Sequence, residues 1–239
     1  QIEDKYGRDN MQFRLAALAF LLVLTTVGGV FATHAMKEPT LISPATPGEA
    51  IAELVAGNAR YVSGKTESHN LPAARAGLAE GQSPFAAVIR CADSRVAPEI
   101  VFDQPLGELF VCGVAGNIPT PEIIASLEYG VAVLGCKAIV IMGHSSCGAV
   151  IAAIESRDDT SALPGSLPGL IDQIVVPCAE KAEDDSQSSL DKAIACNAHE
   201  GIGRLLKGSE IIAKGVKAGT LSVISGVQNL KTGRFTLTE

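Results

Sequence analysis

The chain has 239 residues, of which 47% are hydrophobic and 19% are charged, with 24 Gly, 12 Pro and no Trp, a composition typical of one globular domain with a short appended segment. Acidic residues outnumber basic residues by 26 to 19 and the basic residues form no stripe, so binding to nucleic acid is not expected. The 6 Cys are too few and too unevenly spaced for a disulfide scaffold, which favours metal ligation or a few buried thiols.

The first segment in chain order is a predicted leader. Residues 15–32 carry no charge, Arg14 precedes them, and the small residues Thr33 and Ala35 lie at the −3 and −1 positions of a cleavage site. This pattern predicts a secretory signal peptide over residues 11–35.

Cleavage at this point defines the remaining segments. Residues 1–10 are interpreted as sequence upstream of the start, residues 36–45 as an extended, Pro-rich linker, and residues 46–239 as one domain. The mature protein is expected to be periplasmic or secreted, with no stable membrane association. The alternative is an uncleaved anchor, because the uncharged stretch just reaches the lower length limit for a membrane span.

The domain is predicted to begin with a helix. Thr46 is an N-cap residue, Pro47 suits the first helical position, and Glu49 lies three residues after the cap, which together form a capping box. Apolar residues then recur at helical spacing as far as Gly64, so this helix has one face to bury.

Apolar runs predict a buried parallel sheet in the rest of the domain. Three such runs are expected to be strands, at residues 85–89, 109–114 and 138–142. A helix over residues 120–134 joins the second strand to the third in a crossover connection. Further elements are expected as helices over residues 170–176, 190–206 and 209–216 and as a hairpin over residues 221–228 and 234–237. The predicted fold class is α/β, with a mostly parallel central sheet flanked by helices, an N-terminal helical arm and a C-terminal hairpin.

Two segments that follow predicted strands contain candidate metal ligands. Cys91 comes directly after the first strand, and His144 and Cys147 follow the third. In parallel sheets the loops after the carboxyl ends of strands carry function. Two thiolates and one imidazole are a ligand set for zinc that leaves a fourth position open. Each half of the pattern alone is weak, because a Cys at a strand end is more often a buried apolar residue.

An acidic and a basic residue lie beside the first of these candidates. Asp93 is close enough to Cys91 in sequence to compete for the metal, and Arg95 can hold the Asp93 carboxylate away in a charge-assisted pair. Such a pair can switch the fourth zinc position between closed and open. The alternative is a surface ion pair of little energetic value.

The segments Cys91-Ala-Asp93-Ser-Arg95 and His144-Ser-Ser-Cys147-Gly148-Ala149 resemble the two zinc motifs of the β-class carbonic anhydrases. The resemblance extends from about Thr46 to the terminal hairpin. It implies one Zn²⁺ per chain held by Cys91, His144 and Cys147, with Asp93 as an exchangeable fourth ligand and Arg95 as its partner in catalysis.

The same resemblance implies a substrate site and a dimer. It places residues of the carbon dioxide and bicarbonate site at Gln82, Phe110, Ala115, Tyr129 and Gly148. In that family some pocket walls come from a second subunit, which implies a homodimer or a dimer of dimers, with the helix from Thr46 as an arm around the neighbour.

The sequence also departs from the family pattern. The family usually places an Arg that supports the dimer interface before Ala-Gly-Asn, and this Arg is absent here, since Gly113-Val114 stand there. The lack of Trp argues against a subgroup that closes its zinc site with a Trp-lined bicarbonate pocket. An open site at neutral pH is therefore expected.

The predicted activity is reversible hydration of carbon dioxide by zinc-bound hydroxide, since zinc lowers the pKa of bound water to roughly 7. Hydrolysis of carbon disulfide or carbonyl sulfide is one alternative, and a non-catalytic zinc module is another. His69 and His199 are expected to be solvated or surface residues, and Cys112 and Cys136 to be buried thiols. Export would permit a disulfide between Cys178 and Cys196.

Overall fold

The computed structural model describes residues 43–69, 71–175, 178–179 and 186–238. The predicted leader and most of the predicted linker lie outside these residues. No helix within the described ranges is long and apolar enough to cross a membrane.

A five-stranded sheet in the order β2-β1-β3-β4-β5 forms the centre of the domain. Four strands are parallel, and the last pairs antiparallel with β4 as the predicted hairpin. The strands are β1 (Ala86–Arg90), β2 (Leu109–Gly113), β3 (Ala138–His144), β4 (Ser222–Gln228) and β5 (Phe235–Leu237). The predicted α/β class with a mostly parallel sheet is confirmed.

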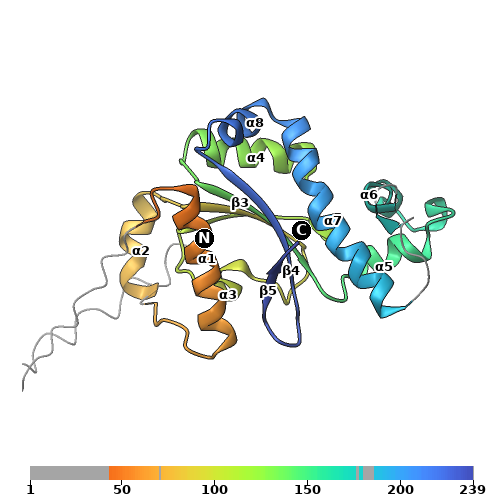
Figure 1. Ribbon diagram of the computed structural model, residues 1–239, viewed down its shortest axis with the longest axis horizontal. Helices are drawn as coiled ribbons and strands as arrows, with labels where there is room; N and C mark the ends of the chain where they lie inside the picture. The colour runs from red at the N-terminus through yellow and green to blue at the C-terminus, as the bar shows by residue number, and fades with distance from the viewer. Residues whose placement is uncertain (1–42, 70, 176–177, 180–185, 239) are drawn as a thin grey trace, which may run out of the picture. The chain divides into compact units, whose positions relative to one another are not determined.

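The helices pack on both faces of this sheet. They are α1 (Pro47–Val62), α2 (Leu71–Glu80), α3 (Pro98–Val101), α4 (Pro121–Ala132), α5 (Gly148–Glu155), α6 (Leu167–Val175), α7 (Gln187–Gly208) and α8 (Glu210–Lys217), with short 3-10 turns η1 (Ala115–Asn117) and η2 (Thr160–Ala162). One apolar cluster joins the sheet to α1, α3, α5 and α6, and a second joins it to α4 and α8, while α7 contributes to both. Figure 1 shows α4 and α8 on one side of the sheet and α1 and α3 on the other.

Strand β3 shows why the apolar runs become central strands. All its residues are buried, and alternate side chains enter the two apolar clusters: Val140 lies in the first, and Ile139 and Ile141 lie in the second. The first five residues of β3, Ala138–Met142, are all apolar because both faces of the strand are covered, and this is the pattern that predicted it.

Helix α1 begins with the predicted capping box. The Glu49 backbone N–H donates to Thr46 Oγ1 at 3.2 Å, and the Thr46 N–H donates to Glu49 Oε2 at 3.1 Å. The buried face of α1 packs on its own chain, where Gly57 lies against the Phe102 carbonyl at the end of α3.

Asn58 is the polar centre of this packing. Its buried amide donates to the carbonyl oxygens of Val101 and Gly233, each at 3.0 Å, and its Oδ1 accepts from the Phe235 N–H at 2.9 Å. One side chain therefore joins α1, α3 and the terminal hairpin.

Candidate metal centre

The carboxyl ends of β1 and β3 bring the three candidate ligands together. Cys91 follows the last residue of β1, His144 ends β3, and Cys147 precedes the first residue of α5. Because β1 and β3 are parallel neighbours, their carboxyl ends lie at the same edge of the sheet. One ligand atom from each residue lies within 4.8 Å of the other two, and all three residues are buried. The two Sγ atoms are 4.0 Å apart.

The imidazole of His144 is oriented to bind a cation. Its Nδ1 lies 3.0 Å from the Ser145 carbonyl oxygen, which accepts only, so Nδ1 carries the hydrogen. Its Nε2 is buried and, among the described residues, has no hydrogen-bond partner. A buried nitrogen without a partner is costly unless something binds it. The tautomer and the donor set of two thiols and one imidazole fit a zinc ion.

The ionisation of the two thiols is linked. The contact with Cys147 lowers the pKa of Cys91 to about 4, and the same contact raises the pKa of Cys147. Burial acts to lower the pKa of His144, but its interactions with Cys91 and the negative charge of Asp93 outweigh burial and raise it. The opposite shifts mean that ionisation of one thiol opposes ionisation of the other, and a divalent cation bound by both sulfurs would relieve this opposition.

Backbone amides and one guanidinium surround the Cys91 segment. The Gly116 N–H donates to Cys91 Sγ at 3.3 Å. Arg90 Nη1 donates to the Cys91 carbonyl at 2.7 Å and to the Asp93 carbonyl at 3.4 Å. The sequence analysis did not predict this role for Arg90. The pattern that could have indicated it is a single basic residue at the end of an otherwise apolar strand.

Asp93 and Arg95 form the predicted pair. Arg95 Nε donates to Asp93 Oδ1 at 2.9 Å and Nη2 donates to Oδ2 at 2.6 Å, while the Arg95 backbone N–H also reaches Oδ1 at 2.9 Å. The guanidinium hydrogen bonds hold the pKa of Asp93 far below its usual range. Oδ2 lies 3.9 Å from His144 Nε2, so the carboxylate is beside the metal centre while Arg95 binds it. The structure therefore shows the predicted pair of Asp93 and Arg95 beside the three candidate ligands.

The five predicted substrate residues lie in three places. Ala115 precedes Gly116 in η1, and Gly148 follows Cys147 as the first residue of α5, so both adjoin the metal centre in sequence. Phe110 on β2 packs against Tyr129 on α4, with ring centroids 6.2 Å apart. Gln82 is exposed before β1, at the opposite end of this strand from Cys91.

The remaining candidates lie away from the centre. His69 is not fully solvated as expected, because its Nε2 lies 3.7 Å from the buried carboxylate of Asp103 and its side chain is half-buried. His199 is exposed on α7, as predicted. Cys112 and Cys136 are buried, also as predicted, and burial raises the pKa of Cys136 to about 11.

The structure also contains the disulfide that the sequence permitted. Cys178 and Cys196 are bonded, with their Cα atoms 5.6 Å apart, a separation typical of disulfides.

Comparisons with known proteins agree with this geometry. Residues 86–235 match the carbonic anhydrase family. The chain is 38% identical over 182 residues to carbonic anhydrase 2 of Mycobacterium tuberculosis, which covers 76% of this chain and 87% of that protein. It is 37% identical over 183 residues to the carbonic anhydrase of Mycolicibacterium smegmatis, covering 76% and 88% respectively.

Solved structures give the same result. The fold matches a β-carbonic anhydrase of Sordaria macrospora, described as tetrameric, with a TM-score of 0.63 and 25% identity over 78% of this chain and 95% of that one. It matches Coccomyxa β-carbonic anhydrase, solved with acetazolamide, with a TM-score of 0.60 and 26% identity over 78% and 80% of the two chains.

The fold, the buried Cys-His-Cys cluster and these similarities place the chain in the β-class of the carbonic anhydrase family. It is an enzyme of the lyase class that catalyses the reversible hydration of carbon dioxide to bicarbonate and a proton. The comparisons give no support to the two alternatives, hydrolysis of sulfur-containing gases and a non-catalytic zinc module.

Proposed function

We propose that Cys91, His144 and Cys147 bind one zinc ion per chain and that carbon dioxide is hydrated at this zinc. The observation that carries the proposal is the buried Nε2 of His144, which lies beside two thiols and has no hydrogen-bond partner in the described part of the chain. Bound zinc supplies Lewis acidity, which lowers the pKa of water from 15.7 to roughly 7.

The protein residues around the metal centre then have separate tasks. Arg95 binds both carboxylate oxygens of Asp93 and so keeps this side chain from acting as a fourth ligand. Asp93 Oδ2 retains a lone pair beside the centre and orients a hydrogen of the reacting water. The Gly116 N–H withdraws charge from Cys91 Sγ, which offsets part of the electron donation by two thiolates.

Removal of a ligand tests this assignment. We expect His144→Ala and Cys91→Ala each to lose both zinc and hydration activity, because two remaining ligands do not retain the metal. Zinc content and stopped-flow hydration are measured on the same sample at neutral and mildly alkaline pH. Cys112→Ala is the matched control, since Cys112 is a buried thiol outside the cluster, and it should keep zinc and activity. Full activity in a zinc-free variant would contradict the proposal.

The substrate pocket is proposed to form between the two subunits of a homodimer, alone or within a dimer of dimers. Within one chain Gln82 lies at the opposite end of β1 from Cys91, and Phe110 on β2 packs against Tyr129 on α4. The side chain of Tyr129 is 49% exposed, and Val133 at the end of α4 is 64% exposed. Two large exposed side chains one turn apart support a contact with a partner at this position. The tetrameric state of the Sordaria macrospora relatives also supports an oligomer.

Export to the periplasm or medium is proposed from two features. One is the uncharged segment at residues 15–32 with small residues after it. The other is the Cys178–Cys196 disulfide, because disulfides persist mainly in oxidising compartments. N-terminal sequencing of the native protein after cell fractionation tests this, and we expect a start near Met36 in the exported fraction. A native protein found only in the cytosol, with residues 11–35 attached, would contradict it.

A further inference from the structure

Gly116 joins the metal centre to the helices behind it. Its N–H donates to Cys91 Sγ at 3.3 Å, and its φ of 74° is a left-handed conformation that glycine adopts without strain. The direction of this N–H depends on where the peptide groups on either side of Gly116 are held. Among the described residues, side chains from α5, α6 and α7 lie against this residue, and those from α6 and α7 bear on its position.

The first contact comes from α6. A Cβ atom added at Gly116 would lie 2.6 Å from Ile174 Cδ1 and 3.3 Å from Ala149 Cβ. Ile174 is fully buried. Its side chain therefore packs directly on the Gly116 backbone and limits movement of this residue away from Cys91.

The second contact comes from α7. Asn197 Nδ2 donates to the Gly116 carbonyl oxygen at 2.7 Å, and the Asn197 side chain is buried. The carbonyl is thus held from one side while the N–H of the same residue points to Cys91 Sγ.

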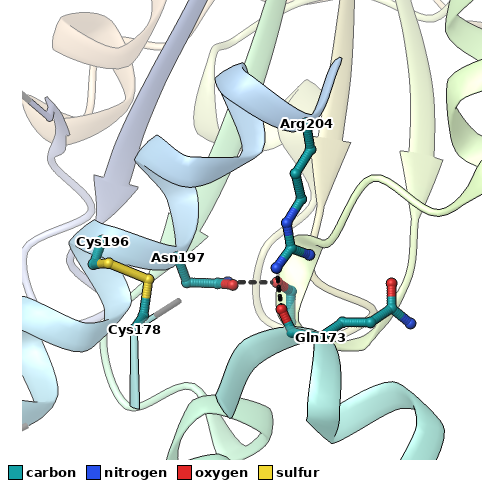
Figure 2. The surroundings of a disulfide bond; sticks show 6 residues. Gln173, Cys178, Cys196, Asn197 and Arg204 are labelled. Atoms are coloured by element: carbon teal, nitrogen blue, oxygen red, sulfur yellow. Dashed lines mark hydrogen bonds between the residues drawn. A yellow bond between two sulfur atoms is a disulfide. The ribbon is translucent and has the colours of Figure 1, made fainter. Parts of the chain in front are cut away.

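The disulfide ties these two contacts together. Cys196 directly precedes Asn197, and Cys178 donates its N–H to the Ile174 carbonyl at 3.3 Å. Arg204 on α7 also donates to the Gln173 carbonyl on α6. Figure 2 shows Cys196, Asn197 and Arg204 along α7, with Cys178 and Gln173 on the opposing segment. We call the set Ile174, Cys178, Cys196 and Asn197 the helix clamp.

We propose that the helix clamp holds Gly116 so that its N–H donates to the zinc ligand Cys91, and that Asn197 is a positioning residue that slows zinc release. This inference rests on the proposed zinc ligand set. A hydrogen bond to a thiolate ligand reduces the negative charge on its sulfur and fixes the orientation of the side chain. Loss of such a contact to a metal ligand typically lowers metal affinity 10–100-fold. The disulfide contributes by fixing α7 to α6 at the residue before Asn197.

The first test is Asn197→Leu, which keeps a side chain branched at the same carbon but removes the donor. We expect zinc to leave the purified holoenzyme about tenfold faster, as measured by transfer to a chromophoric chelator. In the cobalt-substituted protein the thiolate-to-metal absorption band should move to longer wavelength, because the sulfur loses its hydrogen bond. Lys192→Ala, an exposed change on the same helix, is the matched control and should leave both readouts unchanged.

The second test is the double variant Cys178→Ser/Cys196→Ser. Serine variants are preferred to a dithiol reductant, which would itself bind zinc. We expect faster zinc release in this variant too. In the triple variant, which adds Asn197→Leu, the increase in the release rate should be smaller than the product of the two separate increases, since both act through Gly116. Circular dichroism confirms that each variant is folded.

The outcomes separate this proposal from the one on which it rests. Wild-type protein that binds no zinc would refute the ligand set itself. If wild-type protein binds one zinc per chain and folded Asn197→Leu releases zinc at a rate within twofold of wild type, the helix clamp is overturned. Unchanged release in the disulfide variant would overturn it as well. If Asn197→Leu fails to fold, Asn197→Ser, which keeps a shorter donor, should show release between wild type and the disulfide variant.

Discussion

Among individual residues, Arg95 combines high exposure with a central contact. Its side chain is 54% exposed, while that of its partner Asp93 is only 18% exposed. A pair open to solvent on one side contributes little to stability. The contribution of Arg95 must therefore be to fix the position of the Asp93 carboxylate. A substitution of Arg95 should then affect activity much more than stability.

A pair of substitutions at Arg95 measures this role. In Arg95→Gln we expect zinc content to stay at one per chain and kcat/KM for hydration to fall at least about tenfold, because Asp93 is no longer held away from the metal. Arg95→Lys keeps the charge but not the two-pronged geometry, so it should recover only part of the activity. The melting temperature should hardly change in either variant. Wild-type kcat/KM in Arg95→Gln would show that the pair has no catalytic role.

Among the elements, α1 approaches α3 most closely at one glycine. A Cβ atom at Gly57 would overlap the carbonyl oxygen of Phe102 and come within 3.0 Å of Gln104 Nε2. The obstacle is backbone rather than the end of a flexible side chain, so relief requires that the helix move. Gly57 therefore leaves no room for a side chain between α1 and the Phe102 carbonyl.

Two alanine substitutions in α1 should therefore differ sharply. Gly57→Ala is expected to lower the free energy of unfolding by about 3 kcal/mol, because overpacking displaces α1. Gly48→Ala meets no atom within 4 Å and should change it by less than about 0.5 kcal/mol. Urea denaturation of the two variants gives both values. Equal urea midpoints for the two variants would mean that α1 moves to accommodate the Cβ atom at Gly57 with no loss of stability.

Predictability from the sequence varied by element for physical reasons. Strand β3 and helix α4 were predicted because long apolar or amphipathic runs with clear boundaries leave few alternatives. Helix α2 was missed because it has no buried residue and hence no apolar stripe. Helix α5 was missed because it starts at Gly148, directly after the loop that carries the ligands.

The same distinction holds within the site. The Cys91, His144 and Cys147 set was predictable because Cys91 follows β1, His144 ends β3, and Cys147 lies three residues further on in the loop before α5. The contacts of Asn197 with Gly116 and of Arg90 with the Cys91 carbonyl depend on tertiary packing, and no local pattern marks them.

For the whole molecule, the position of three predicted substrate residues, Gln82, Phe110 and Tyr129, outside the metal centre has a direct consequence. If a partner subunit completes the pocket, zinc binding requires residues of one chain only, whereas activity requires residues of two chains. The two properties should then respond differently to a change at the subunit contact.

Val133→Arg tests this separation. A charge at this exposed position beside Tyr129 should convert the oligomer to monomers in analytical ultracentrifugation and lower hydration activity at least about tenfold, with zinc still at one per chain. Leu167→Arg places the same charge at a 45% exposed position on α6 and serves as the control. A fully active monomer would contradict the shared pocket.

The three hydrogen bonds of Asn58 affect the order in which the chain folds during translation. This residue lies 175 positions before Gly233, one of its partners, and another partner is Phe235. The ribosome therefore releases α1 long before the hairpin that completes its docking site exists. Helix α1 can contact α3 as soon as that segment is made, but its hydrogen bonds to the hairpin form only when the last strands emerge. A chain halted before residue 233 would leave this part of α1 open to chaperones and proteases.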